Sequence, residues 1–142
     1  MPQRGSRPQE LSDADYQRLL QFRIGLRRFL HWSKAQVTAA GLTPAKHQLL
    51  LAIRGHADPR GPTILDVAGY LLLRHHSAVG LVDRAADAGL VVRRPDEDDR
   101  RAVRLRLTRR GARLLRELTA SHLEELSRLG LQGGTIWEGL EE

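Results

Sequence analysis

Two groups of polar side chains have the types and spacing needed to contact a polyanion. Arg74-His75-His76-Ser77 stands at the start of a predicted helix, where side chains and free backbone N–H groups point away from the helix end. Arg100 and Arg101 stand in a polar stretch between two predicted strands. A guanidinium group can make two parallel hydrogen bonds to guanine or phosphate. These residues therefore predict binding of nucleic acid.

The distribution of charge supports the same prediction. The 142-residue chain has a net charge of +6, and 21 of its 23 basic residues are Arg. Between Arg93 and Arg116 there are ten arginines and four acidic residues, so this segment accounts for the whole excess. A basic segment in an otherwise neutral chain is typical of DNA-binding proteins. A solvated hairpin without a partner is the alternative explanation of the cluster, and a GC-rich genome that favours Arg codons would explain part of the excess of Arg over Lys.

Several function classes have no support in the sequence. The chain has no cysteine, no apolar run long enough to span a membrane and no signal-peptide pattern, so we expect a cytoplasmic protein that joins the nucleoid when bound. It has no catalytic or cofactor motif, and residues 96–99 resemble carboxylates at a loop tip rather than an acid–base pair. The neighbouring His75 and His76 do not share a helix face, so no metal site is expected.

Helix-start and strand patterns predict a mainly α fold with a small two- to three-stranded antiparallel wing. The signals are a capping box at Ser12 and Asp15, a cap at Thr43-Pro44, and a second capping box at Thr63. The predicted helices cover residues 12–40, 43–55, 63–71 and 74–88, followed by strands at 90–94 and 102–107. Thr108 caps a last long helix to about residue 129, and one more short helix is expected within 130–142.

The sequence resembles the MarR family of bacterial transcription regulators. The resemblance is based on residues 41–44, 66–71, 77–91, 99–101 and 107–111, which occur in the order and spacing of that family. It implies a winged helix-turn-helix with N- and C-terminal dimerisation helices. It also implies a homodimer whose two recognition helices contact successive major grooves of a pseudo-palindromic operator in double-stranded DNA. The expected division is a flexible arm at 1–11 and one domain at 12–142, with dimerisation helices at 12–40 and 109–142 around a DNA-binding part at 43–108.

The predicted DNA contacts come from the recognition helix and the wing. They are Arg74, His75, His76, Ser77, Gly80, Arg84, Arg100, Arg101 and Arg104. Gly80 would permit close approach of DNA to the backbone, or would simply be tolerated. We expect one wing arginine to enter the minor groove and the other to pair with an acid such as Asp99 or Asp83. Arg84, Arg104 and Arg106 would contact phosphates or remain solvated.

A ligand pocket between the dimer helices and the DNA-binding part is a further hypothesis. Its candidate residues are Phe22, Phe29, His31, Trp32 and His47, for which a dimer core is the alternative explanation. The predicted function is a DNA-binding regulator, in the form of a repressor released by a small aromatic effector. The alternative is a winged-helix protein-interaction module whose basic face meets an acidic protein without specific DNA binding.

Overall fold

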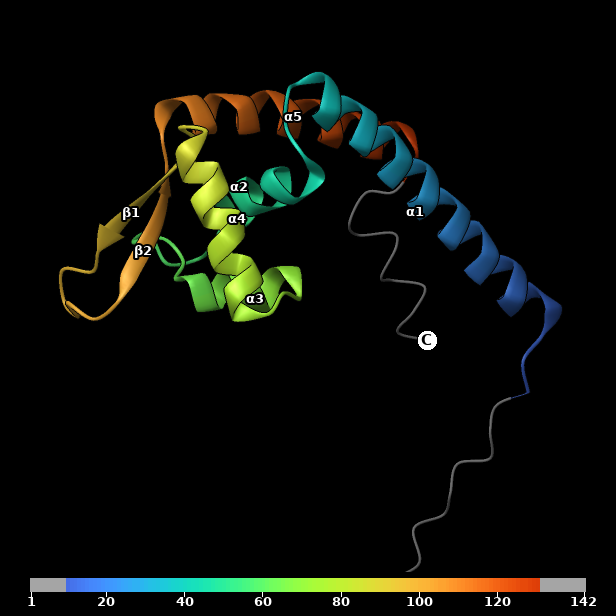
Figure 1. The fold of residues 1–142 in the computed structure, drawn as a ribbon. Helices are drawn as coiled ribbons and strands as arrows, with labels where there is room; N and C mark the ends of the chain where they lie inside the picture. The colour runs from blue at the N-terminus through green and yellow to red at the C-terminus, as the bar shows by residue number, and fades with distance from the viewer. Residues whose placement is uncertain (1–9, 131–142) are drawn as a thin grey trace, which may run out of the picture.

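The computed structural model describes residues 10–130 of the chain. The described part contains five helices and one sheet: α1 (Asp13–Ala39), α2 (Pro44–Gly55), α3 (Ile64–Leu71), α4 (His75–Asp87), β1 (Val91–Pro95), β2 (Val103–Leu107) and α5 (Arg109–Arg128) (Figure 1). This order agrees with the prediction. The predicted N-terminal arm and the last short helix fall outside the described residues, apart from residues 10, 11 and 130.

Side-chain caps start four of the five helices, as the sequence predicted. Ser12 and Thr63 each form a complete capping box, with Asp15 and Asp66 as the returning carboxylates. Thr43 and Thr108 accept from the amide three residues later. These caps satisfy N–H groups that the first turn of a helix leaves without a partner. By contrast, α4 starts at Arg74 without a side-chain cap.

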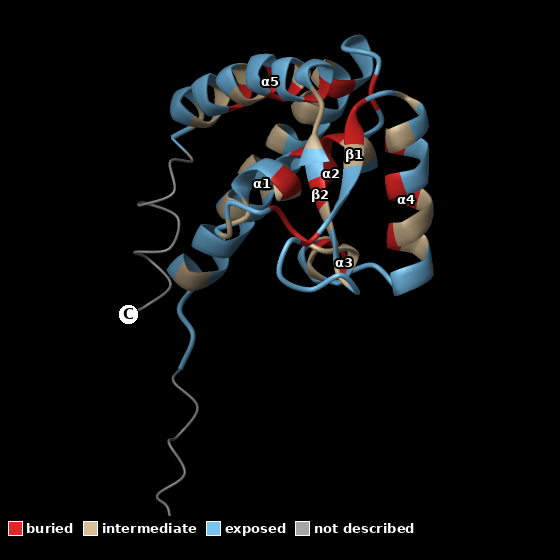
Figure 2. Ribbon diagram, turned by 90° about the vertical axis from the view of Figure 1, so that its left-hand side faces the viewer, coloured by how far each residue is buried: buried red, intermediate tan, exposed pale blue. Residues whose placement is uncertain are grey.

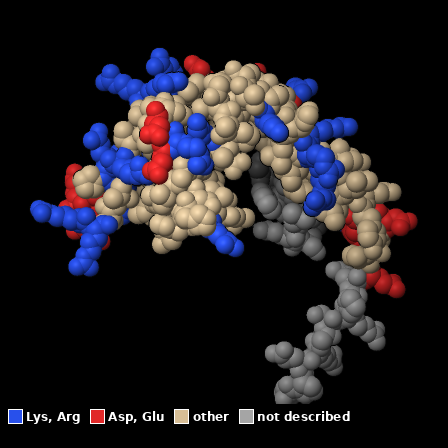
Figure 3. All heavy atoms as spheres, in the orientation of Figure 1, with Lys and Arg blue, Asp and Glu red and all other residues tan. Residues whose placement is uncertain are grey.

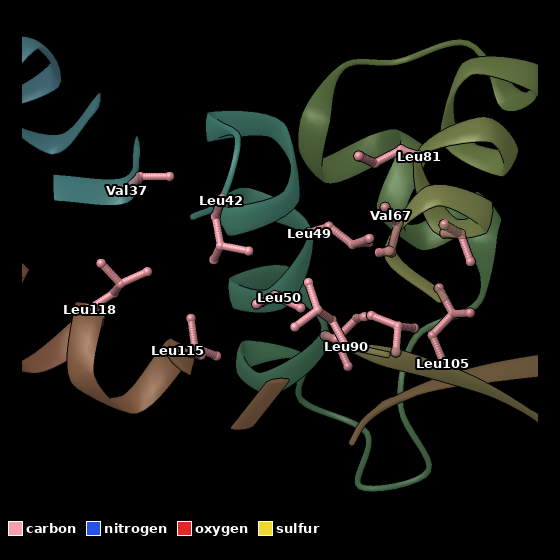
Figure 4. Close-up of a cluster of buried hydrophobic side chains, with 14 residues drawn as sticks. Val37, Leu42, Leu49, Leu50, Val67, Leu81, Leu90, Leu105, Leu115 and Leu118 are labelled. Atoms are coloured by element: carbon pink, nitrogen blue, oxygen red, sulfur yellow. The ribbon is translucent and has the colours of Figure 1, made fainter. Parts of the chain in front are cut away.

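The core lies between α2 and the elements that surround it. Leu49 and Leu50 of α2 are completely buried, in a cluster that also contains apolar side chains from all the other helices and from the sheet (Figure 4). The buried stripe of α4 consists of Ala78, Leu81, Val82 and Ala85, which recur at the spacing of three and four residues that places side chains on one face of a helix. This stripe fixes the rotation of α4, so the opposite face of the helix is turned to solvent.

The wing is a two-stranded antiparallel hairpin that projects from the helical body (Figure 1). Val91 pairs with Leu107 and Pro95 with Val103. Both strands begin one residue later than predicted. Leu90 precedes β1 as a buried core residue, and its carbonyl accepts from the amide of Thr108 at 3.0 Å. In place of a third strand, a single backbone hydrogen bond of 2.8 Å joins Leu105 to the carbonyl of Pro62.

Most of α1 projects beyond the body of the protomer. Val37 is the only buried residue of this 27-residue helix, and Figure 2 shows exposed positions along most of its length. Large apolar side chains remain exposed on it, among them Tyr16, Leu19, Leu20 and Leu30. Exposed apolar surface of this extent is typical of an interface with another protein chain.

Candidate nucleic-acid interface

The recognition helix presents its predicted contact residues to solvent. Arg74, His75 and His76 are exposed at the start of α4, and Ser77 is half-buried. Within residues 10–130, no ion pair or hydrogen bond occupies the side chains of Arg74, His75 or His76. The uncapped first turn also leaves backbone N–H groups free to meet an anion.

The turn between α3 and α4 is closed by a residue in an unusual conformation. Leu72 has a φ of 54°, the left-handed region that favours glycine, and it is 92% exposed. Its amide donates to the carbonyl of Ala68, as does the amide of Leu73 at 2.9 Å. These bonds end α3 and direct the chain into α4, which lies across α3 as in a helix-turn-helix (Figure 1).

Gly80 lies at the middle of α4 beneath the side chain of Arg84. A Cβ atom at position 80 would stand 3.1 Å from Nη1 of Arg84 and would meet no other group outside its own helix within 3.4 Å. Neither of the two roles predicted for Gly80 included this contact. Because Gly80 has no side chain, the Arg84 guanidinium can lie against the exposed face of the helix at this position.

The tip of the wing carries free positive charge. Arg100 and Arg101 are exposed, and their side chains form no ion pair with any residue from 10 to 130. Figure 3 shows basic side chains projecting from the hairpin end of the molecule beside acidic ones. The predicted pairing of a wing arginine with Asp83 or Asp99 is wrong. Asp83 pairs instead with Arg93 of β1, and the Asp99 carboxylate accepts from the backbone amide of Arg101.

Arg104 occupies a different environment from the other predicted contacts. Its side chain is only 16% exposed; its Nε donates to Asp96 at 2.7 Å and its Nη1 to the carbonyl of Gly61 at 3.2 Å. Asp96 is buried, contrary to the prediction that residues 96–99 are all loop-tip carboxylates. Sequence reasoning missed Asp96 and Arg60 because the ion pair between them joins residues 36 positions apart.

The predicted pocket residues divide into two groups. Phe29, Trp32 and His47 gather around His122 of α5, with ring centroids 4.9–5.7 Å from its imidazole. His31 instead lines a shallow hollow on α1 with Arg23, Leu26, Arg27, Leu30 and Lys34. Phe22, which is half-buried, belongs to neither set. The aromatic cluster therefore contains His122, which was not among the predicted pocket residues.

Hydrogen bonds fix the orientation of the His122 ring. Its Nδ1 donates to the carbonyl of Leu118 at 2.6 Å, and its Nε2 lies 2.6 Å from the hydroxyl of Ser33. Burial lowers the pKa of the adjacent His47, and the electrostatic effect of the nearby His122 lowers it further. Burial therefore favours the neutral form of the His47 imidazole where α1, α2 and α5 meet.

Residues 10–130 lack two further kinds of site. No group of three or more His, Cys, Asp or Glu side chains in that range could hold a metal ion. None of its helices is long and apolar enough to cross a membrane.

The arrangement of a short helix, a turn, an exposed recognition helix and a basic hairpin defines the class of winged helix-turn-helix proteins. Comparison with known proteins shows a similarity to one family. Residues 40–102, the winged helix-turn-helix part of the chain, match the model of the MarR family. No curated protein sequence matches the chain.

Solved structures of MarR-type proteins superimpose on most of the chain. CouR from Rhodococcus jostii RHA1, solved with p-coumaroyl-CoA, is 26% identical, with a TM-score of 0.71 over 93% of this chain and 91% of that one. A MarR family protein from Bacillus stearothermophilus is 22% identical, with a TM-score of 0.72 over 92% and 89%. A mutant of MepR from S. aureus, solved with an oligodeoxyribonucleotide, is 20% identical, with a TM-score of 0.65 over 93% and 91%.

Proposed function

We propose that this chain is a sequence-specific regulator of transcription that binds double-stranded DNA as a homodimer. The observation that supports this best is the set of unpaired cations at two places on the winged helix. Arg74 stands free at the start of α4, and Arg100 and Arg101 stand free at the wing tip. The acidic residues Asp83 and Asp96 of the same region are engaged by other arginines. The protein therefore offers DNA positive charge that its own carboxylates do not neutralise.

In this proposal the recognition helix enters the major groove and the wing reaches the adjacent minor groove. Arg74 makes the fork contact with guanine, which discriminates against a wrong base by about 1–3 kcal/mol. His75, His76 and Ser77 approach neighbouring base edges or phosphates. An arginine of the wing tip enters the minor groove, where a narrow A·T tract has enhanced negative potential.

The exposed apolar face of α1 supports the homodimer. Leu19, Leu20 and Leu30 are each more than half exposed in the protomer, and a second copy of the chain would cover them. Two-fold symmetry places two recognition helices on half-sites about 34–36 Å apart, one turn of B-DNA. A pseudo-palindromic operator is the expected target.

The direct test is footprinting on the region upstream of the protein's own coding sequence, followed by binding of the protected duplex. The double variant Arg100→Ala/Arg101→Ala should lose most of the affinity without unfolding. Arg113→Ala/Arg116→Ala, which removes the same charge from exposed positions on α5, should bind nearly as tightly as the wild type. Equal binding of all duplexes, specific and random, would instead favour the protein-interaction module.

We further propose that the regulator is a repressor released by a small aromatic anion. The rings of Phe29, Trp32 and His47 surround His122 at the junction of α1 with the DNA-binding part, and basic side chains line a separate hollow on α1. CouR was solved with p-coumaroyl-CoA, an aromatic thioester. A thermal-shift screen of aromatic acids and their thioesters tests the idea. A compound that stabilises the protein should also weaken operator binding, and a compound that stabilises without doing so would contradict it.

A further inference from the structure

Asp96 is a buried carboxylate at the point where β1 passes into the wing tip. Its side chain is 2% exposed, although its neighbours Glu97 to Arg101 are all exposed. Burying a charged carboxylate is unfavourable unless hydrogen bonds and opposite charge compensate for the lost water. Four donors meet this requirement, and they come from two different parts of the chain.

One carboxylate oxygen of Asp96 forms hydrogen bonds within the wing tip. Oδ1 of Asp96 accepts from the backbone amides of Asp98 at 2.9 Å and Asp99 at 3.4 Å. This bonding holds the start of the turn that carries Arg100 and Arg101. Hydrogen bonds from Asp98 and Arg104, together with the positive charge of Arg60, hold the pKa of Asp96 below its usual range.

The other oxygen connects the wing to the loop between α2 and α3. Oδ2 accepts from Nε of Arg104 at 2.7 Å and from Nη1 of Arg60 at 3.4 Å. Arg60 belongs to that loop and is also held by Asp58 at 2.8 Å. We call Asp58, Arg60, Asp96 and Arg104 the wing anchor.

Backbone contacts strengthen the same connection. Arg104 donates to the carbonyl of Gly61, and Leu105 donates to the carbonyl of Pro62. Gly61 has a φ of +91°, and a Cβ atom there would stand 2.2 Å from the carbonyl oxygen of Leu105. Only glycine allows the loop to approach β2 so closely. The loop before α3 is therefore fitted against the base of the wing.

We infer that the wing anchor positions the wing arginines for DNA, with Asp96 as its central residue. A lone two-stranded hairpin is marginally stable in water, so the direction of its tip depends on what holds its base. The anchor fixes the hairpin against the loop that leads directly into the helix-turn-helix. Arg104 and Arg60 are then positioning residues rather than DNA contacts. This inference depends on the proposed function only for its effect on DNA.

The variant Asp96→Asn separates the two roles of the carboxylate. An amide oxygen can still accept from the backbone of Asp98, whereas the amide NH₂ cannot accept from Arg104 or Arg60. Glu97→Gln removes the same charge from an exposed neighbour and is the matched control. Arg60→Gln removes the loop's side of the anchor and provides a second variant, should Asp96→Asn fold poorly.

Two measurements test the inference. In the free protein, hydrogen exchange at the amides of Ala102 and Leu105 should quicken in Asp96→Asn and Arg60→Gln but not in Glu97→Gln. On the operator, Asp96→Asn should lose about tenfold in affinity, equivalent to about 1.4 kcal/mol. That loss should disappear when Arg100 and Arg101 are already alanine.

The outcomes distinguish the inference from the proposed function. Unchanged exchange in both anchor variants overturns the wing anchor, whether or not the protein binds DNA. A tenfold loss that persists without the tip arginines also overturns it, because the effect would then not act through them. If the wild type binds no duplex specifically, the exchange measurement still decides whether the anchor holds the wing.

Discussion

Replacing Gly80 with alanine should stabilise the protein and at the same time weaken its binding to DNA. Gly80 is in the middle of α4, where alanine is favoured over glycine by about 1 kcal/mol. The added methyl group would meet only the end of the Arg84 side chain, at 3.1 Å. A flexible side chain can move away at little cost, so most of that 1 kcal/mol should appear as a gain in the free energy of unfolding.

The same movement should reduce affinity, because it displaces the Arg84 guanidinium on the face of α4 that we propose meets DNA. One charged hydrogen bond contributes about 1.5–3 kcal/mol, and a partial loss corresponds to roughly a tenfold decrease in affinity. Unfolding in urea and fluorescence anisotropy with a labelled operator should be measured for the wild type, Gly80→Ala, Arg84→Ala and the double variant. In the Arg84→Ala background, Gly80→Ala should no longer affect binding.

Two results would refute this reasoning. If Gly80→Ala still weakens binding when Arg84 is absent, DNA approaches the helix backbone directly at Gly80, as one of the sequence hypotheses held. If Gly80→Ala lowers the free energy of unfolding instead of raising it, the methyl group meets something more rigid than an arginine side chain. In either case Arg84 would not be the residue through which Gly80 acts.

Three further outcomes are expected. Because burial lowers the pKa of His47, the folded state binds fewer protons there than the unfolded chain. The free energy of unfolding, measured in urea, should therefore fall as the pH drops below about 6.5, and His47→Gln should reduce this dependence on pH. Leu20→Asp should shift the protein towards monomer in sedimentation, whereas Leu65→Asp, equally apolar and 72% exposed but on α3, should not. Arg74, Arg84, Arg100 and Arg101 form no ion pair with residues 10–130 of their subunit, which makes eight such arginines per dimer, so log K should fall with log salt at a slope of about −7. A slope near −11 would mean that the paired Arg93 and Arg104 also reach phosphate.

Local signals in the sequence were sufficient to predict the helices and the exposed face of α4. Caps such as Thr63 act on amides three residues away, and apolar spacing of three and four places Ala78 and Leu81 on one side of the helix. The beginnings of the strands were each misplaced by one residue. The cause for β1 is that the Leu90 amide donates to the carbonyl of Ala85 in α4, so that only the Leu90 carbonyl bonds to Thr108, the residue opposite it in the register.

Pairings between distant residues could not be predicted in the same way. Nothing near Asp96 in the sequence indicates that Arg60 and Arg104 will meet it, because their approach depends on how the loop before α3 packs against the hairpin. The same holds for His122 and its partner Ser33, which are 89 residues apart. The apolar spacing of Leu115, Leu118 and His122 places them on one face of α5, but the partner of His122 on α1 depends on how the two helices pack.

Only some of the arginines between Arg93 and Arg116 are available to bind DNA, because others form ion pairs within the protein. Counting charges in the sequence treats the ten arginines between Arg93 and Arg116 as one footprint for DNA. In the structure, Arg93 and Arg104 are held by Asp83 and Asp96, so a part of the positive charge builds the wing and another part remains free at its tip. A carboxylate in this segment therefore does not simply subtract from DNA binding. Asp83 and Asp96 each pair with one arginine and do not pair with Arg100 or Arg101. We therefore expect the affinity for DNA to depend on which arginines remain unpaired more than on the net charge of the segment.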